Sequence, residues 1–339
     1  MTFEAVGIGD LHLTDTLGKG GLASYIKNHD RFVMRLVDQC LEFAKKRAIT
    51  EIFLYGDICE STRMSYEGQL ALLTLFRSNP NLKFHVILGN HDKVAIDSSA
   101  GHSLQLIEAM KIPNFVLYKD DSKVVKFGDA LVNFMSWPSA SFKSRSNLLN
   151  VGHIDVKGAK TDSGRLLDAE DLPASKAASV MGHIHTKQKI RNTHYSGTLY
   201  QTNFGEAPEK FFHHIVYDGS WEVFNIPVKN IYTLHSVEVK TKRDLKNIPA
   251  SPRDLVKLIL LEGCEITTKD YGDLNVVKVR SVKSEKDLAL ARIEDLSSGS
   301  EIEISSREFF VEWLKNQDVS KEQKKQTIAL RSKLLKESK

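Results

Sequence analysis

The hydrophobic pattern of the chain repeats one design: a short apolar segment ends at a glycine, and acidic, amide or imidazole side chains follow at once. Ile52-Phe53-Leu54-Tyr55-Gly56 is the clearest case, because it is rich in strand-forming residues and is followed by Asp57. Open α/β sheets bind ligands at the carboxyl ends of their strands. Each segment is therefore predicted to deliver its polar residues to that edge. The five sets are Asp10 and His12, Asp57, Asn90 with His91 and Asp92, His153, and His183 with His185.

Between the first strands, apolar residues recur at helical spacing. From Asp30 to Arg47 they predict an amphipathic helix, and shorter helices are expected near Gln69 to Arg77 and Ser103 to Lys111. Beyond about residue 193 the pattern becomes strand–turn–strand, with Gly219-Ser220 as a hairpin turn. Strand–helix alternation followed by hairpins predicts an α/β fold in which two sheets pack together with helices outside.

The character of the sequence changes near residue 228. Residues 1–228 contain every glycine-ended segment with metal-type side chains, whereas residues 229–304 contain none and are predicted to form a small separate α/β domain. The strands expected there are His235–Val239 and Val276–Val279, and the helices are Pro252–Leu261 and Glu285–Ile293.

Residues 305–339 combine an aromatic segment with a lysine-rich one. Phe309, Phe310 and Trp313 would be exposed on two short helices, which make a poor unit on their own. We expect a helical hairpin that docks a partner protein, with packing back onto its own domain as the alternative.

The composition is ordinary for a globular protein, with 339 residues, 41% hydrophobic and 27% charged. No apolar run approaches the roughly 18 residues of a membrane span, and the first strand begins too early for a targeting segment. Cys40, Cys59 and Cys264 form no CxxC pair, which argues against a Cys-based zinc site and fits a reducing cytoplasm. The net charge of +4 permits a nucleic-acid partner without requiring one.

The loop from Leu13 to Asn28 contains Gly18-Lys19-Gly20-Gly21 but lacks the spacing of a P-loop, and no such match occurs elsewhere. The missing P-loop is consistent with any ATP hydrolysis being carried out by another chain. The loop is either a flexible surface connection or a substrate contact through Lys19. His102 is a second candidate for a substrate contact.

Asp10-x-His12 and His183-x-His185 can each aim two side chains at one point, because alternate residues of an extended segment face the same side. Carboxylate, amide and imidazole donors without a thiolate suit Mn²⁺, Fe²⁺, Zn²⁺ or Mg²⁺. Two such ions about 3.5–4 Å apart, bridged by one carboxylate, activate water and bind a phosphate. Asp57 is the carboxylate best placed to be that bridge.

His91 directly follows the expected ligand Asn90, so we expect it beside the metals rather than on them. An imidazole there could protonate the leaving oxygen or stabilise charge on the phosphorus centre, with Asp92 fixing its tautomer.

Taken together, the motifs resemble those of the calcineurin-like metallophosphoesterases: Asp10-x-His12, Gly56-Asp57, Gly89-Asn90-His91-Asp92, Gly152-His153 and Gly182-His183-x-His185. The resemblance covers residues 1–228 and implies a four-layer αββα sandwich with two divalent metal ions, Mn²⁺ being expected and Mg²⁺ the alternative. It also implies the ligands. The first ion would be held by Asp10, His12, Asp57 and His185, and the second by Asp57, Asn90, His153 and His183.

Within that superfamily, the segment from Tyr195 to Glu206 resembles one in the SbcD-type DNA nucleases, the catalytic subunits of SbcC/SbcD recombination–repair complexes. The compact size resembles the phage members, which act in the host cytoplasm. The resemblance implies a two-metal DNA exonuclease or structure-dependent endonuclease of repair, recombination and replication. Residues 229–304 would cap the DNA site, residues 305–339 would dock an SbcC-type, SMC-like ATPase, and the nuclease would be a dimer within the complex.

One position departs from the family pattern: Glu60 stands three residues after the bridging aspartate, where several relatives have a histidine. That substitution puts exonuclease efficiency in question. Two other hypotheses stay open. One is a metallophosphodiesterase of small substrates, such as cyclic nucleotides or nucleotide-linked lipids. The other is a non-catalytic scaffold, which failure to bind metal would support.

Overall fold

The computed structural model describes residues 2–14, 22–94, 101–161, 166, 177–249, 251–272, 274–284 and 287–288. By its internal contacts the chain divides into two units, Met1–Gly299 and Ser300–Lys339. The predicted docking hairpin at residues 305–339 and the candidate substrate contact Lys19 lie outside the described residues. The predicted domain boundaries at residues 228 and 304 stay predictions.

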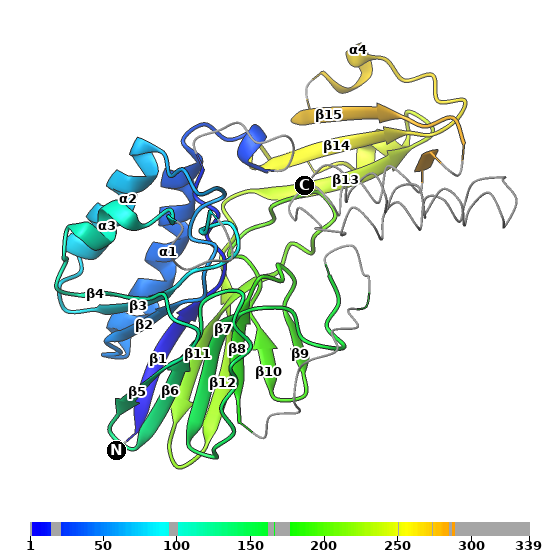
Figure 1. Ribbon diagram of the computed structural model, residues 1–339. Helices are drawn as coiled ribbons and strands as arrows, with labels where there is room; N and C mark the ends of the chain where they lie inside the picture. The colour runs from blue at the N-terminus through cyan, green and yellow to red at the C-terminus, as the bar shows by residue number, and fades with distance from the viewer. Residues whose placement is uncertain are drawn as a thin grey trace, which may run out of the picture. The chain divides into compact units, whose positions relative to one another are not determined.

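The first sheet has the strand order β12-β11-β1-β2-β3-β4 (Figure 1). Its four mutually parallel strands are β1 (Phe3–Ile8), β2 (Glu51–Leu54), β3 (Lys83–Ile87) and β4 (Phe115–Tyr118). Antiparallel pairing extends the sheet beyond β1 with β11 (Lys210–Tyr217) and β12 (Trp221–Val228). These last two strands are the hairpin predicted around Gly219-Ser220.

Helices connect the parallel strands of the first sheet, as the alternating pattern predicts. They are α1 (His29–Lys46), α2 (Tyr66–Arg77) and α3 (Gln105–Ala109), with a short 3₁₀ turn η1 (Leu22–Ser24) before α1. The apolar stripe of α1, which includes Val33, Leu36 and Cys40, is buried in the main core. Among the helices of the described part of the chain, none is long and apolar enough to cross a membrane.

The second sheet has the order β5-β6-β7-β8-β10-β9. Its parallel centre is flanked at each edge by an antiparallel strand. The strands are β5 (Lys123–Phe127), β6 (Ala130–Phe134), β7 (Leu148–His153), β8 (Ser179–Gly182), β9 (Gln188–Ile190) and β10 (Thr193–Tyr195).

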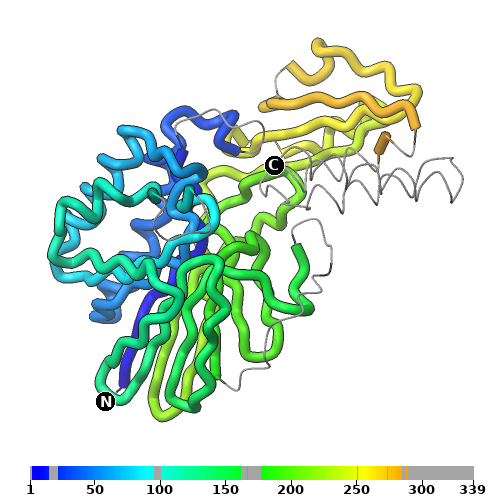
Figure 2. The backbone as a smooth tube through the Cα atoms, viewed as in Figure 1, coloured from blue at the N-terminus to red at the C-terminus, as the bar shows by residue number. Residues whose placement is uncertain are grey.

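The two sheets pack face to face. Phe53 of β2 and Ile87 of β3 share one apolar cluster with Phe134 of β6 and Val151 of β7. The opposite face of the first sheet packs against the helices, so α1, α2 and α3 and the second sheet lie on opposite sides of it (Figure 2). The predicted α/β sandwich is confirmed. The described residues between β5 and β10 contain no helix, so they supply three of the four expected layers.

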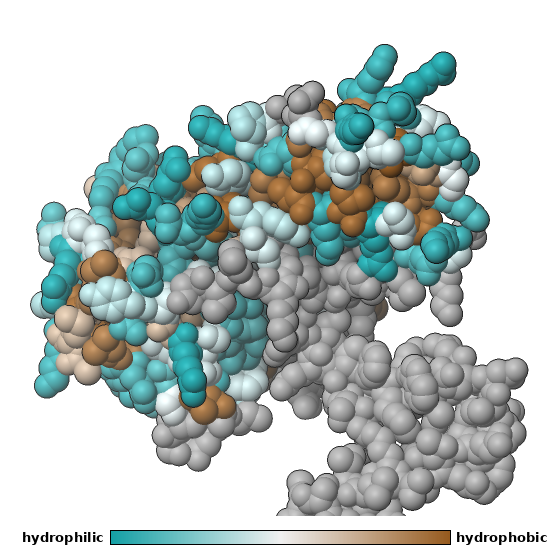
Figure 3. Space-filling model, turned by 90° about the horizontal axis from the view of Figure 1, so that it is seen from above, coloured by the Kyte–Doolittle hydropathy of each residue, from teal (hydrophilic) through white to brown (hydrophobic). Residues whose placement is uncertain are grey.

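A third sheet of three parallel strands follows, in the order β13-β14-β15. It comprises β13 (Thr233–Val239), β14 (Asp254–Leu260) and β15 (Val276–Ser281), with η2 (Asp244–Asn247) and α4 (Thr268–Tyr271). It has an apolar cluster of its own around Val239, Val256 and Leu258, whereas Leu234 and Leu255 belong to the main core. Seen from above, apolar side chains form a band over this sheet (Figure 3).

The helix predicted at Pro252–Leu261 is wrong, because this segment forms β14. The strand lies between two neighbours, and Leu255 to Ile259 are buried on both of its faces. A strand buried on both faces has a continuous apolar run rather than an alternating one, which periodicity cannot distinguish from a buried helix. Most of the other expected helix, Glu285–Ile293, lies outside the described residues.

Candidate metal centre

Each glycine-ended segment forms the strand that the pattern predicts, and the polar residues lie at the carboxyl ends of these strands. Asp10 and His12 follow β1, Asp57 follows β2, and Asn90 and His91 follow β3; His153 is the last residue of β7, and His183 and His185 follow β8. Within the described chain, three clusters of candidate ligands are close enough to hold an ion, and together they include every predicted ligand except the amide Asn90. The clusters are Asp10 with His12 and His185, Asp57 with His153 and His183, and His12 with Glu60 and His91.

The glycines before these ligands are needed because the strand ends approach very closely. A Cβ atom on Gly89 would lie 2.1 Å from Oδ1 of Asp57, and one on Gly182 would lie 2.4 Å from Oδ1 of Asp10. Both distances are far below a normal contact, so any larger residue would push a carboxylate out of place. Gly89 and Gly182 are therefore part of the site's geometry.

The first donor group joins the two sheets. Nε2 of His12 lies 3.1 Å from Nε2 of His185, which in turn lies 3.9 Å from Oδ2 of Asp10. The Asp10 carboxylate also accepts the backbone N–H of His183, at 2.9 Å. All three donor side chains of this group are almost completely buried.

The second donor group centres on Asp57 and His153. Oδ2 of Asp57 lies 3.1 Å from Nε2 of His153 and 4.0 Å from Nε2 of His12, so this carboxylate stands between the two groups. Oδ1 of Asn90 lies 3.0 Å from Nε2 of His153 and 2.9 Å from Nδ1 of His183. The structure thus brings all seven predicted ligands together.

Three of these ligands have a backbone conformation that side chains rarely adopt. The φ angles are 47° at His12, 45° at Asp57 and 88° at His183. Positive φ costs energy for any residue with a Cβ and is concentrated at functional sites. Strain at three ligands indicates that the surrounding contacts hold the donors in place.

The electrostatics of the centre favour a bound cation. Burial raises the pKa of Asp57, but the neighbouring His153 ring outweighs burial and holds the pKa well below its usual value. Burial lowers the pKa of His153, but the Asp57 and Asp10 carboxylates raise it to about 9. The buried carboxylates thus draw positive charge into the site. A cluster of oxygen and imidazole donors with that preference fits divalent metal ions.

His91 lies beside the donors. Its backbone N–H donates to Oδ1 of Asp57 at 2.9 Å, and its ring centre is 5.1 Å from that of His12. Its Nδ1 donates to the backbone carbonyl of Glu60 at 2.9 Å, which leaves Nε2 available to a substrate. The contact that fixes the tautomer of His91 is therefore made by a carbonyl and not by the predicted Asp92.

The Asp92 carboxylate has a different set of partners. It accepts the backbone N–H groups of Ile58, Cys59 and Gly89 and the hydroxyl of Ser103, at 2.8 to 3.2 Å. Its partners thus come from the loop after β2, the end of β3 and the segment before α3. Asp92 therefore connects the loops that carry the proposed ligands. The prediction that Asp92 fixes the tautomer of His91 is wrong, because its carboxylate bonds to these loops instead.

Several residues that the sequence analysis did not assign contact the second ring nitrogen of a ligand. Oε2 of Glu60 lies 2.8 Å from Nδ1 of His12, the Tyr55 carbonyl accepts from Nδ1 of His153 at 2.7 Å, and Asp155 lies 3.4 Å from Nε2 of His183. Such contacts orient metal-binding histidines. The sequence spacing His153-x-Asp155 was a signal that could have identified Asp155.

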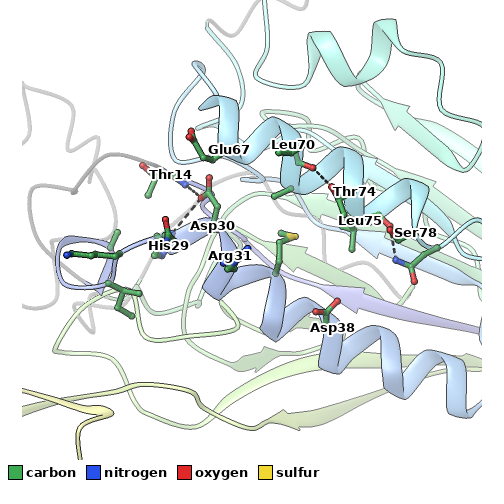
Figure 4. Close-up of a pocket in the computed structure, with 17 residues that line it drawn as sticks. Thr14, His29, Asp30, Arg31, Asp38, Glu67, Leu70, Thr74, Leu75 and Ser78 are labelled. Atoms are coloured by element: carbon green, nitrogen blue, oxygen red, sulfur yellow. Dashed lines mark hydrogen bonds and ion pairs between the residues drawn. The ribbon is translucent and has the colours of Figure 1, made fainter.

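The candidate substrate contact His102 is not brought to the donors. Its side chain is buried, and its Nε2 lies 3.2 Å from Oε2 of Glu108 in α3. The pocket with a volume of about 1050 Å³ is also elsewhere, between α1 and α2, where Asp30, Asp38 and Thr74 line it (Figure 4). None of the seven predicted ligands lines that pocket.

Two facing sheets that gather carboxylate, amide and imidazole donors at their strand ends form the framework of a metal-dependent phosphoesterase. No protein-family model matches the chain. The chain is 24% identical over 225 residues to exonuclease subunit 1 of Enterobacteria phage T4. The match covers 60% of this chain and 61% of that protein, which is less than two thirds of the relative's length. It confirms the predicted resemblance to a phage nuclease subunit.

Two solved structures are also similar to the chain. One is an archaeal phosphodiesterase, with 12% identity and a TM-score of 0.31, covering 66% of this chain and 100% of that one. The other is a purple acid phosphatase from yellow lupin (Lupinus luteus) seeds, with 11% identity and a TM-score of 0.38, covering 66% of this chain and 52% of that one.

Proposed function

We propose that the chain is a metal-dependent DNA nuclease, an exonuclease or a structure-dependent endonuclease, that hydrolyses phosphodiester bonds. The position of Asp57 carries this proposal. Its carboxylate lies between two donor groups, 3.1 Å from His153 and 4.0 Å from His12, as a bridge between two cations requires. The match to a phage exonuclease subunit favours DNA as the substrate.

Two divalent ions, with Mn²⁺ the first choice, would occupy the centre. Asp10, His12, Asp57 and His185 would hold the first, and Asp57, Asn90, His153 and His183 the second. When bound, such ions would polarise a phosphate and lower the pKa of a water molecule, so that hydroxide is available as the nucleophile near neutral pH. The chain's own donors set the positions. Five of them, Asp10, His12, Asp57, His153 and His185, are buried, and Asn90 and His183 are half-buried.

His91 would act as a general acid beside the reacting phosphate. Its Nδ1–H donates to the Glu60 carbonyl, so the protonated ring would give its Nε2 proton to the leaving oxygen and be left as the neutral Nδ1–H form. Its backbone N–H donates a hydrogen bond to Oδ1 of Asp57, which fixes the main chain of His91 next to the proposed bridging carboxylate.

We further propose that the nuclease works in an SbcC/SbcD-type repair and recombination complex as a dimer, with residues 229–304 as a DNA-binding cap. Residues 305–339 would dock the ATPase. The free cysteines Cys40, Cys59 and Cys264 support a reducing cytoplasmic location.

The test is hydrolysis of labelled duplex and single-stranded DNA with Mn²⁺, Mg²⁺ or EDTA, comparing the wild type with His91→Ala. We expect Mn²⁺-dependent cleavage that EDTA abolishes and that His91→Ala lowers by about 10²–10⁴-fold, as for loss of a general acid. His214→Ala is the matched control, because that imidazole pairs with Glu4 and contacts none of the predicted ligands.

A His91→Ala enzyme with near-normal turnover would remove His91 from the mechanism. Cleavage of a small phosphodiester without any cleavage of DNA would favour the small-substrate hypothesis. Absence of metal binding would favour the scaffold.

The proposed partner has a separate test. Deleting the chain from Ser305 onward should leave Mn²⁺-dependent hydrolysis intact and abolish capture of the ATPase subunit. A truncated chain that still recovers the ATPase would contradict the docking assignment.

A further inference from the structure

A buried polar network lies behind His185, on the side away from the other metal donors. Its centre is the carboxylate of Glu206, whose side chain has no exposed surface. The carboxylate accepts the side-chain N–H of Asn203 at 2.9 Å, and it also contacts the Thr202 hydroxyl and the Lys210 ammonium closely. Its Oε1 lies 3.6 Å from Nδ1 of His185.

The Thr202 hydroxyl lies between the ring and the carboxylate. Its Oγ1 is 3.3 Å from Nδ1 of His185 and donates its hydrogen to Oε1 of Glu206. A hydroxyl has one hydrogen, and an ionised carboxylate can only accept. Because the hydroxyl hydrogen is given to Glu206, Oγ1 must accept from His185, so Nδ1 carries the ring hydrogen. The lone pair is then on Nε2, the nitrogen that faces His12 and Asp10.

Lys210 keeps the carboxylate ionised without exposing it. The Lys210 ammonium forms a buried ion pair with Oε2 of Glu206. The Lys210 ammonium also donates to the backbone carbonyl of His185 at 3.4 Å and to Thr198 at 3.1 Å. The network therefore holds both the ring and the main chain of the ligand.

The same segment is anchored to the third sheet. The amide of Gln201 donates to the backbone carbonyls of Glu206 at 2.8 Å and Leu234 at 3.1 Å, and its oxygen accepts the N–H of Leu234 at 2.9 Å. Leu234 belongs to β13. Gln201 itself is 3% exposed, so these bonds are shielded from water.

We propose that Thr202 and Glu206 are positioning residues: a relay from Nδ1 of His185 through the Thr202 hydroxyl to the Glu206 carboxylate fixes the tautomer in which Nε2 binds the first metal ion. This inference rests on the proposed metal centre, though not on DNA as the substrate. The second donor group has no member in the relay, so we expect Thr202 to act directly on the first ion and on the second only through the shared Asp57.

Thr202→Val and Thr202→Ser test the relay in the full-length protein. Valine keeps the shape of threonine but removes the hydroxyl, whereas serine keeps the hydroxyl. Mn²⁺ binding is measured by calorimetry, and the tautomer of His185 by ¹⁵N NMR of the metal-free protein. We expect Thr202→Val to weaken one of two Mn²⁺ sites by about 10- to 100-fold, as loss of an outer-shell partner does. It should also shift the His185 ring toward the Nε2–H form.

Thr202→Ser should bind both ions as the wild type does and keep the Nδ1–H form. Equal Mn²⁺ binding and an unchanged tautomer in Thr202→Val would overturn the relay. So would equal losses in Thr202→Val and Thr202→Ser, because the hydroxyl would then not be the determinant. If the wild type itself binds no Mn²⁺, the proposed metal centre is overturned together with the relay. If the wild type binds Mn²⁺ and Thr202→Val does not differ from it, only the relay is overturned.

Discussion

Replacing Gly89 by alanine tests whether close approach of the strand ends sets the position of the Asp57 carboxylate, the proposed bridge. The added Cβ would lie 2.1 Å from Oδ1 and 2.4 Å from the backbone nitrogen of Asp57, against a minimum of 3.0 Å for real contacts. The carboxylate must therefore retreat by at least 0.9 Å, the difference between 3.0 and 2.1 Å. Rotating the side chain would not relieve the clash with the backbone nitrogen, so the ends of β2 and β3 must also separate.

A displacement of about 1 Å at a reacting centre can cost about 10²-fold in rate. We therefore expect Gly89→Ala to lower kcat/KM for a chromogenic phosphodiester, measured with Mn²⁺, by about that factor. Overpacking of this kind costs roughly 1–3 kcal/mol, so the thermal midpoint should fall as well. The enzyme should still fold, because the substitution adds a single methyl group.

Gly128→Ala is the control for lost stability. Gly128 has φ +59°, and a Cβ added there would meet no atom within 4 Å, so alanine introduces backbone strain but no clash. Its expected cost is about 1–2 kcal/mol, with unchanged kcat/KM. If Gly89→Ala kept wild-type activity and bound two Mn²⁺ ions, the reasoning from close approach would be refuted. An equal loss of activity in Gly128→Ala would refute it too.

Two further predictions concern the bridge and acid stability. Asp57→Asn should weaken binding of both Mn²⁺ ions, because one carboxylate serves both donor groups; calorimetry that still counts two tight sites would contradict the bridging role. The second concerns His213, whose pKa burial lowers to about 3. Between pH 6.5 and 3 the unfolded chain binds a proton at His213 that the native state does not. The contribution of His213 to the free energy of unfolding is therefore fully present above pH 6.5 and is lost as the pH decreases. The expected slope is about 1.4 kcal/mol per pH unit, and urea denaturation at pH 6.5 and 5 should show a smaller loss for His213→Gln than for the wild type.

Much of the sandwich could be predicted because its signals are local. The helix expected from Asp30 to Arg47 is α1 at His29–Lys46, since one helix face is apolar throughout. The strands β2 and β3, which end just before Gly56 and Gly89, were also predictable from local signals. Their apolar runs are short and rich in strand-forming residues, which favours a strand over a helix.

What escaped prediction depends on contacts between distant segments. The partners of Asp92 are backbone N–H groups in the loop after β2 and at the end of β3, whose positions only the folded sheets define. Thr202 reaches His185 across 17 residues, and no spacing rule connects them. The helix predicted at β14 was wrong because the strand is buried by two neighbouring strands and by three apolar clusters, none of which is visible in its own seven residues.

The proposed metal donors come from both sheets, and this has a consequence for protein synthesis. Ribosomes add about 5–20 residues per second, and Asp10 and His12 emerge long before their partner His185. The first donor group cannot form until β8 has been made, and β1 gains its second neighbouring strand only when β11 follows. A nascent chain that has not yet reached β11 would therefore have no completed metal site, so the proposed cleavage of DNA would begin only after that strand had been translated.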